Sequence, residues 1–135
     1  MTGRSLGSIV ALVVAAAVSC ATPMAAGRVS GSWGGAGIAV SLNPAGGTLE
    51  YDCAAGRIDG PIVPRSDGGF TVRGSHTPGT GGPERVDQPR PSYPATYSGS
   101  IVGERMTLRG RVANGQALGP FELRRGVEPV LHRCL

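Results

Sequence analysis

Hydrophobic and polar residues alternate along the chain from residue 31 onward, so the dominant period is two residues rather than the 3.6 of a helix. The segment Arg105–Val112 shows this best, because its alternation turns Met106, Leu108 and Val112 to one face and arginines to the other. Shorter segments with the same pattern occupy residues 37–42, 48–53, 69–74, 96–102, 120–124 and 130–134, with a weaker one at 57–63. The pattern predicts eight strands and no helix.

Turn-forming residues fill the intervals between these segments. The connections rich in Asn, Asp, Gly and Pro are Asn43–Gly47, Ser66–Gly69, Gly103–Glu104, Asn114–Gly115 and Gly126–Pro129. Eight short antiparallel strands in sequential order are expected to close as an up-and-down β-barrel, because closure removes exposed sheet edges. The sequence therefore predicts an all-β, lipocalin- or avidin-like barrel over residues 31–135, with a two-sheet β-sandwich as the alternative.

The segment Ser75–Pro94 has five prolines, three glycines and no periodicity, which predicts a 20-residue loop. Loops of this length are either plain excursions between strands or functional elements. The functional interpretation is a lid or binding arm over one barrel mouth that uses polar and aromatic side chains. These are His76, Glu84, Arg85, Arg90 and Tyr93.

The start of the chain has the features of an export signal. Arg4 supplies a positive charge, Ile9–Val18 is unbroken apolar sequence, and small residues follow at Ser19 and Ala21. Ten apolar residues are too few to span a bilayer, which needs about 20. We expect residues 1–20 to be a signal peptide, residues 21–30 to be a flexible linker, and the mature protein to be exported.

The end of this signal resembles a bacterial lipobox, Ala17-Val18-Ser19-Cys20, in which Cys20 receives a diacylglyceryl group. Ala17 stands where that pattern prefers Leu. Lipidation would hold the protein at the membrane surface, since two or more acyl chains make a stable anchor. Cleavage after Ala21 or Ala26 would instead release a soluble periplasmic or secreted protein.

The two remaining cysteines, Cys53 and Cys134, are expected to form a disulfide that clamps the domain nearly end to end. With one Trp, two Phe and three Tyr beside 23 Gly and 11 Pro, the predicted core is thin. Small exported domains of this kind commonly depend on disulfides. Closing a loop of roughly 80 residues contributes about 4–5 kcal/mol in the chain-entropy model.

The net charge is +4, and all 13 basic residues are arginines. Nucleic-acid binding requires basic residues clustered with stacking aromatics, whereas these arginines are scattered, so no nucleic-acid partner is expected. Arg105, Arg109 and Arg111 form one predicted stripe. It is either a solvated strand face partly neutralised by Glu104 or Glu122, or a docking patch for phosphate or lipid head groups.

Motifs for catalysis, metal binding or cofactor binding are missing from the sequence. Its two histidines, His76 and His132, lack metal-ligand spacing with a Cys or a carboxylate. Residues Gly79–Gly82 lack the Lys that a P-loop requires. Asp52 and Asp59 are best explained as outward strand charges. We therefore expect a non-enzymatic protein without a metal or cofactor.

Gly31-Ser32-Trp33 resembles the Gly-x-Trp signature of the calycin group, which includes lipocalins, avidins and a family of bacterial periplasmic metalloprotease inhibitors. The resemblance implies an up-and-down barrel in which Trp33 plugs one end beneath an arginine from the last strands, Arg124 or Arg133. The cysteine placement differs from that of the inhibitors, and the chain has too few aromatics for an avidin pocket. A longer set of motifs is similar to uncharacterised bacterial exported proteins. These are Trp33-Gly34-Gly35, Glu50–Ala54, Asp67–Phe70, Gly81–Pro83, Tyr97–Gly99, Met106–Leu108 and Cys134-Leu135.

Two functions fit these observations. The first is a carrier or sensor for an apolar or amphipathic small molecule, held in a pocket of inward-facing side chains. The candidates are Trp33, Ile38, Val40, Tyr51, Phe70, Tyr97 and Phe121. The second is a protease inhibitor or other protein-binding module that acts through the N-terminal segment or the long loop. A cavity of several hundred cubic ångströms would favour the carrier.

Overall fold

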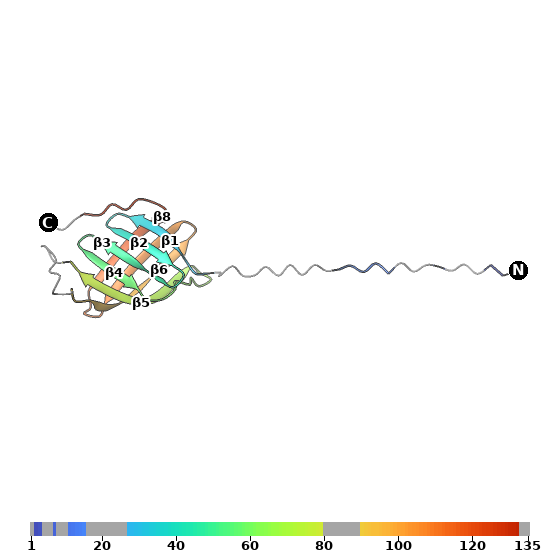
Figure 1. Ribbon diagram of the computed structural model, residues 1–135, viewed down its shortest axis with the longest axis horizontal. Helices are drawn as coiled ribbons and strands as arrows, with labels where there is room; N and C mark the ends of the chain where they lie inside the picture. The colour runs from blue at the N-terminus through green and yellow to red at the C-terminus, as the bar shows by residue number, and fades with distance from the viewer. Residues whose placement is uncertain (1, 4–6, 8–10, 16–26, 80–89, 133–135) are drawn as a thin grey trace.

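In the computed structural model, which describes residues 2–3, 7, 11–15, 27–79 and 90–132, eight antiparallel strands form one closed barrel (Figure 1). The strands follow each other around the barrel in chain order. They are β1 (Gly31–Gly35), β2 (Ile38–Asn43), β3 (Gly46–Tyr51), β4 (Ala54–Ile58), β5 (Gly69–Pro78), β6 (Tyr93–Val102), β7 (Arg105–Val112) and β8 (Ala117–Arg125). Within the described residues, no helix is long and apolar enough to cross a membrane. The predicted fold class is confirmed, in its barrel form rather than as a sandwich.

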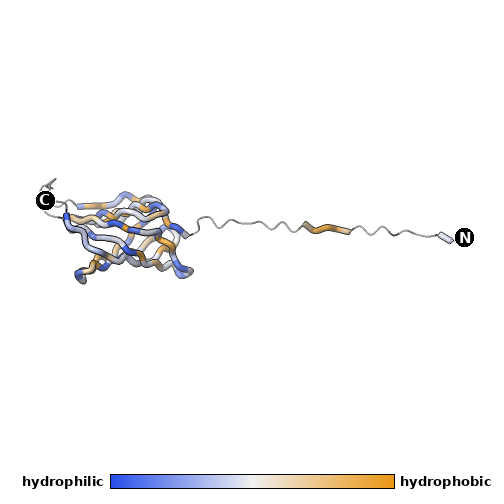
Figure 2. The backbone as a smooth tube through the Cα atoms, turned by 60° about the horizontal axis from the view of Figure 1, so that its bottom comes forward, coloured by the Kyte–Doolittle hydropathy of each residue, from blue (hydrophilic) through white to orange (hydrophobic). Residues whose placement is uncertain are grey.

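The strand with the clearest alternation, β7, has the bounds that its sequence predicts. Met106, Leu108 and Val112 are each 1% exposed, while Arg105, Arg109 and Arg111 are exposed. Turns between strands use the expected chemistry, since the Asn43 side chain accepts hydrogen bonds from the Ala45 and Gly46 amides. In Figure 2 the projecting turns are hydrophilic and the hydrophobic positions are spread along the strands.

Two predicted boundaries in the middle of the chain are wrong. The strand expected at 57–63 is β4, Ala54–Ile58, and residues 59–68 connect it to β5. The loop expected at Ser75–Pro94 is shorter, because β5 continues to Pro78 and β6 begins at Tyr93. The inward positions 74 and 76 of β5 are a glycine and a histidine. The sequence therefore shows no alternation of apolar and polar residues there.

The prediction of an eighth strand at residues 130–134 is also wrong for residues 130–132, which are the part of it that the structure describes. Val130 makes one isolated parallel bridge to Ala36, and the barrel closes instead by pairing β1 with β8. The segment after β8 lies over β1 (Figure 1), where a side chain at Gly34 would collide with the Val127 carbonyl. Glycine at this position permits the close approach of the two backbones.

The two ends of the barrel differ. We call the end with the β2–β3, β4–β5 and β6–β7 connections the closed end, and the other the open end. Packed side chains fill the closed end: Trp33, Leu49, Phe70, Met106 and Leu123 are each no more than 2% exposed. Val29 and Ile62 close it from outside the strands, and the Val29 amide donates a 2.9 Å hydrogen bond to the Ile62 carbonyl. The last residues of the predicted linker therefore pack against the barrel.

Candidate functional site

A pocket of about 460 Å³ lies at the open end of the barrel. Side chains from β3, β5 and β8 line it, together with residues of the β3–β4 and β7–β8 turns. The residues that define its chemistry are Tyr51, Ala54, His76, Pro78, Leu118 and Phe121. Its volume lies in the range of roughly 300–1,000 Å³ that is typical of small-molecule sites.

Tyr51, the last residue of β3, joins the aromatic side chains of this pocket. Its ring centroid lies 5.5 Å from that of Phe121 and 5.7 Å from that of His76, in tilted arrangements. Such spacings are favourable for aromatic pairs. The three rings come from strands that are far apart in sequence and meet only because the barrel is closed.

His76 faces inward from β5 and is 4% exposed. Its Nδ1 is buried without a hydrogen-bond partner among the described residues. Burial lowers the pKa of His76, because desolvation disfavours the imidazolium form. The side chain is therefore neutral at neutral pH. It belongs to the barrel interior rather than to the loop in which the sequence analysis placed it.

Tyr97 lies deeper in the barrel, on β6, and is fully buried. Its hydroxyl donates a 2.8 Å hydrogen bond to the Ser75 carbonyl. Its ring occupies space left by glycines, since side chains at Gly56, Gly74 or Gly110 would meet its ring or hydroxyl within 3.0 Å. These three glycines are on three different strands, so Tyr97 has a niche built for it.

The Tyr51 hydroxyl is directed to the same region, because it too would contact a side chain at Gly56. It has no hydrogen-bond partner that meets standard geometry among the described residues. Burial raises the pKa of Tyr51 far above its ordinary value, and the neighbouring Tyr97 hydroxyl adds to this effect. Burial also raises the pKa of Tyr97. Both phenols are therefore neutral hydrogen-bonding groups.

Of the seven predicted pocket residues, Tyr51 and Phe121 line the open-end pocket and Tyr97 packs behind Tyr51. Ile38 and Val40 are buried outside the pocket lining. Trp33 and Phe70 are buried core residues outside the pocket lining. Sequence analysis missed Leu118 because β8 begins earlier than predicted. The pairing of β7 with β8 shifts between Leu108 and Gly110, so the alternation in β8 is broken there.

Trp33 lies beneath an arginine, but the residue is Arg125 and not the predicted Arg124. The Arg125 guanidinium carbon is 4.6 Å from the centroid of the Trp33 ring. Arg125 is directly opposite Trp33 in the ladder, so both face the same side, whereas Arg124 is opposite Gly34 and faces outward. Arg125 also donates to the Ser30 carbonyl and forms an ion pair with Glu104 at 3.4 Å. The other candidate, Arg133, lies outside the described residues.

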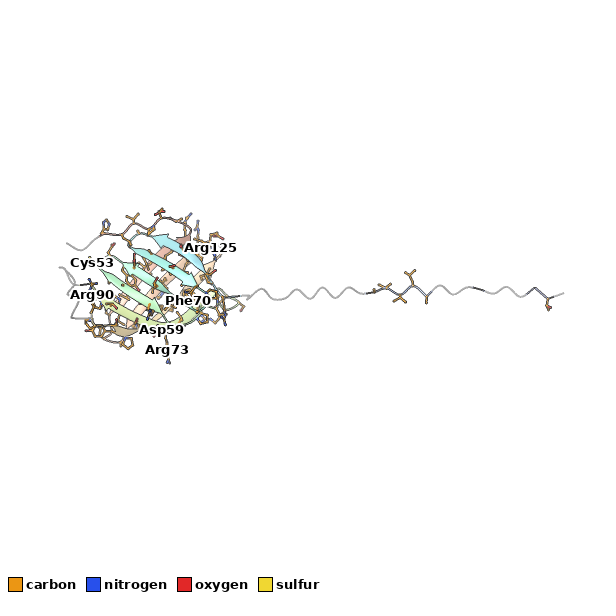
Figure 3. All side chains as sticks on the ribbon, viewed as in Figure 1. Cys53, Asp59, Phe70, Arg73, Arg90 and Arg125 are labelled. Atoms are coloured by element: carbon orange, nitrogen blue, oxygen red, sulfur yellow. The ribbon has the colours of Figure 1, made fainter. Side chains whose placement is uncertain are left out.

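The remaining predicted site residues are only partly described. Arg85 and Glu84 in the long loop, Cys20 and Cys134 lie outside the described residues. Tyr93 begins β6 and is 39% exposed, while Arg90 precedes that strand. Cys53 lies in the β3–β4 turn at the open end, opposite the end that carries Arg125 (Figure 3). The Cys53 sulfur is not a free thiol.

The described residues include no group of three or more His, Cys, Asp or Glu side chains arranged to hold a metal ion. Comparison with known proteins adds no family assignment: no family model, curated protein or solved structure matches this chain.

Proposed function

We propose that the barrel is a carrier or sensor that binds a small, largely apolar molecule in its open-end pocket, without catalysis. The observation that supports this most strongly is the contrast between a filled closed end and a pocket of about 460 Å³ at the open end. A purely structural barrel, or one acting only through its outer surface, has no need for an aromatic-lined hollow. The Tyr51 and Phe121 rings offer apolar contact to a flat or branched ligand.

The proposed ligand also carries a hydrogen-bonding group. Next to the pocket, His76 Nδ1 is buried without a partner in the described part of the chain, and the buried Tyr51 Oη has only the Tyr97 hydroxyl beside it. An unsatisfied buried polar group costs roughly 1–3 kcal/mol. A ligand whose polar group reaches this corner, after a small rotation of either ring, would recover part of that cost. The class of ligand that fits is an amphipathic molecule, with an apolar body and one neutral polar end.

The same proposal places the protein outside the cytoplasm. Residues 1–20 are the proposed export signal, and lipidation of Cys20 would tether the barrel to a membrane surface. Cleavage beyond Cys20 would yield a soluble exported form instead.

The proposed disulfide between Cys53 and Cys134 is supported by the position of the C-terminal segment. The His132 amide donates a 2.6 Å hydrogen bond to the Asp52 carboxylate, which brings residue 132 beside the residue that precedes Cys53. Cys134 is two residues further along, within reach of the roughly 4.4–6.8 Å that a disulfide allows between α-carbons. Cys53 also has a positive φ of 65°, which non-glycine residues rarely adopt. A covalent role for the side chain explains why glycine does not occupy this position.

The alternative, a protease inhibitor or other protein-binding module, would act through the N-terminal segment or the β5–β6 loop. The open-end pocket favours the carrier over this alternative. The resemblance to calycins is compatible with either function. It gains support from Trp33, which lies under an arginine of the last strand as that group implies.

Two experiments test the proposal. Native mass spectrometry of the protein purified from its own host is expected to show a retained small molecule, and it also reports lipidation and the disulfide. In the second, the uncharged fluorescent amphipath N-phenyl-1-naphthylamine is titrated into the purified protein. Leu118→Trp, which fills the pocket, is expected to weaken dye binding at least about tenfold.

The matched control is Val102→Trp, because Val102 is 72% exposed at the β6–β7 turn of the closed end. This variant is expected to bind the dye as the parent protein does. Equal dye binding by the parent and by Leu118→Trp, combined with the absence of any co-purified molecule, would contradict the carrier function.

A further inference from the structure

A second and larger hollow, of about 1250 Å³, lies on the outer face of the barrel across β5, β6, β7 and β8. Three arginines line it: Arg73 from β5, and Arg109 and Arg111 from β7. All three side chains are exposed, and Arg73 points away from the barrel (Figure 3). We call this surface the arginine groove.

The ladder fixes how these side chains are spaced. Thr96 of β6 is directly opposite both Arg73 and Arg111, and Ser98 is directly opposite Arg109. Neighbouring strands are about 4.8 Å apart, and alternate residues of a strand are about 6.8 Å apart. The α-carbons of the three arginines are therefore roughly 7–12 Å apart, with Thr96 and Ser98 between the two strands that carry them.

The positive charge of the groove is poorly compensated. None of the three arginines forms an ion pair with a residue that the structure describes, and Asp59 is the one carboxylate among the described lining residues. On β8 the residue opposite Arg111 is Ala117, which carries no charge. Of the two carboxylates expected from sequence to neutralise this stripe, Glu104 pairs with Arg125 instead. The other, Glu122, is opposite Thr107 and forms no ion pair with a described residue. Three like charges on one recessed surface create a positive potential that attracts anions.

We propose that the arginine groove binds a linear acidic oligosaccharide through its carboxylate or sulfate groups. The planar guanidinium fork matches the geometry of such oxyanions. The intervening Thr96 and Ser98 hydroxyls offer partners for sugar hydroxyls, which a simple anion would not use. The groove is recessed between strands, so an extended chain enters it, whereas a flat membrane surface meets only its rim. The two hollows share Ala117, Leu118 and Gly119 of β8, but none of the three arginines lines the open-end pocket. The proposal does not depend on the carrier function.

The test is isothermal titration of the full-length mature protein with a heparin-derived hexasaccharide, which carries both sulfate and carboxylate groups. Uncharged maltohexaose serves as the matched ligand control. We expect binding of the acidic oligosaccharide, weakened at least about tenfold by the double substitution Arg73→Gln with Arg111→Gln. Binding is also expected to weaken steeply as salt is raised.

The control variant carries Arg105→Gln with Arg124→Gln. These two exposed arginines are opposite each other in the β7–β8 ladder and do not line the groove, so the net charge changes equally. It is expected to bind within about threefold of the parent. Equal weakening by both double variants would overturn the proposal, because net charge alone would then explain binding.

Three further outcomes would overturn it: equal affinity for maltohexaose, no measurable binding of the hexasaccharide at low salt, or binding only to vesicles containing phosphatidylglycerol. Dye binding at the open end is measured in the same samples. Loss of both dye and oligosaccharide binding in the groove variant indicates misfolding. In that case the proposal is tested on the parent protein, by measuring its amide chemical-shift changes when the hexasaccharide is added. Changes at Thr96, Ser98 and Arg109 to Arg111 support the groove, and their absence there overturns it.

Discussion

The two ends of this barrel are formed by the same strands but differ in how their interiors are packed. At the closed end, Trp33, Leu49 and Leu123 pack inside, and Arg125 covers the Trp33 ring. At the open end, the inward positions include the polar His76 and two glycines, Gly56 and Gly74, beside which the Tyr97 side chain packs. Large apolar side chains fill the closed end, and the ligand site that we propose lies at the end that keeps a pocket.

We propose that the Cys53–Cys134 disulfide stabilises the open end. We expect Cys53→Ser combined with Cys134→Ser to lower the free energy of unfolding by about 4–5 kcal/mol, through the loop of roughly 80 residues that the bond closes. Urea denaturation with and without reductant measures this. Should the folded protein contain titratable free thiols at both positions, or keep its stability without them, the open end would not be clamped in this way.

The next largest expected effect compares the stability contributed by side chains at the two ends. Trp33→Ala is expected to cost about 3–5 kcal/mol, because it empties a fully packed site. Phe121→Ala removes a side chain that is only partly buried, so we expect a cost of about 1–2 kcal/mol. Chemical denaturation gives both values. Dye binding is expected to fail in Phe121→Ala and to persist in Trp33→Ala at temperatures where that variant is folded.

A similar cost for the two substitutions, or dye binding that survives Phe121→Ala unchanged, would mean that the ends do not differ as described.

The smallest effect concerns pH. The pKa of His76 is lowered in the folded state, so the unfolded chain binds more protons just below pH 6.5. Stability is therefore expected to fall as the pH drops below about 6.5, by at most about 1.4 kcal/mol per pH unit, and to level off below the folded pKa. His76→Gln should remove this slope. His132→Gln, at an exposed position, should keep it, and a slope that follows His132 would refute the assignment.

Strands can be predicted from the sequence where their inward positions carry large apolar residues. The bounds of β7 are predicted correctly because Met106, Leu108 and Val112 occupy all of its inward positions except Gly110. β1 (Gly31–Gly35) is harder to predict, because apart from Trp33 its inward positions are glycines. Residues 130–134 have strand-like alternation, but within the described residues Val130 makes only an isolated bridge to Ala36, and β1 already pairs with β2 and β8.

The candidate site follows the same rule. Tyr51 and Phe121 were identified from sequence because aromatic residues on strands are easy to assign to the interior. His76 was predicted as a loop residue rather than an interior one, because the many prolines and glycines after it conceal the end of β5. The niche for Tyr97 depends on three glycines from β4, β5 and β7, a relation that exists only once the barrel is closed. The arginine groove likewise requires the ladder that aligns Arg73, Thr96 and Arg111.

The most direct test of the central claim is to map where an amphipath binds. Amide chemical shifts of the labelled protein are recorded while the uncharged amphipath N-phenyl-1-naphthylamine is added. The open-end site predicts the largest changes at Tyr51 to Ala54, at His76 and at Leu118 to Phe121, with little change at the β2–β3 and β6–β7 turns. Changes concentrated at those closed-end turns, or spread over the outer face, would contradict it.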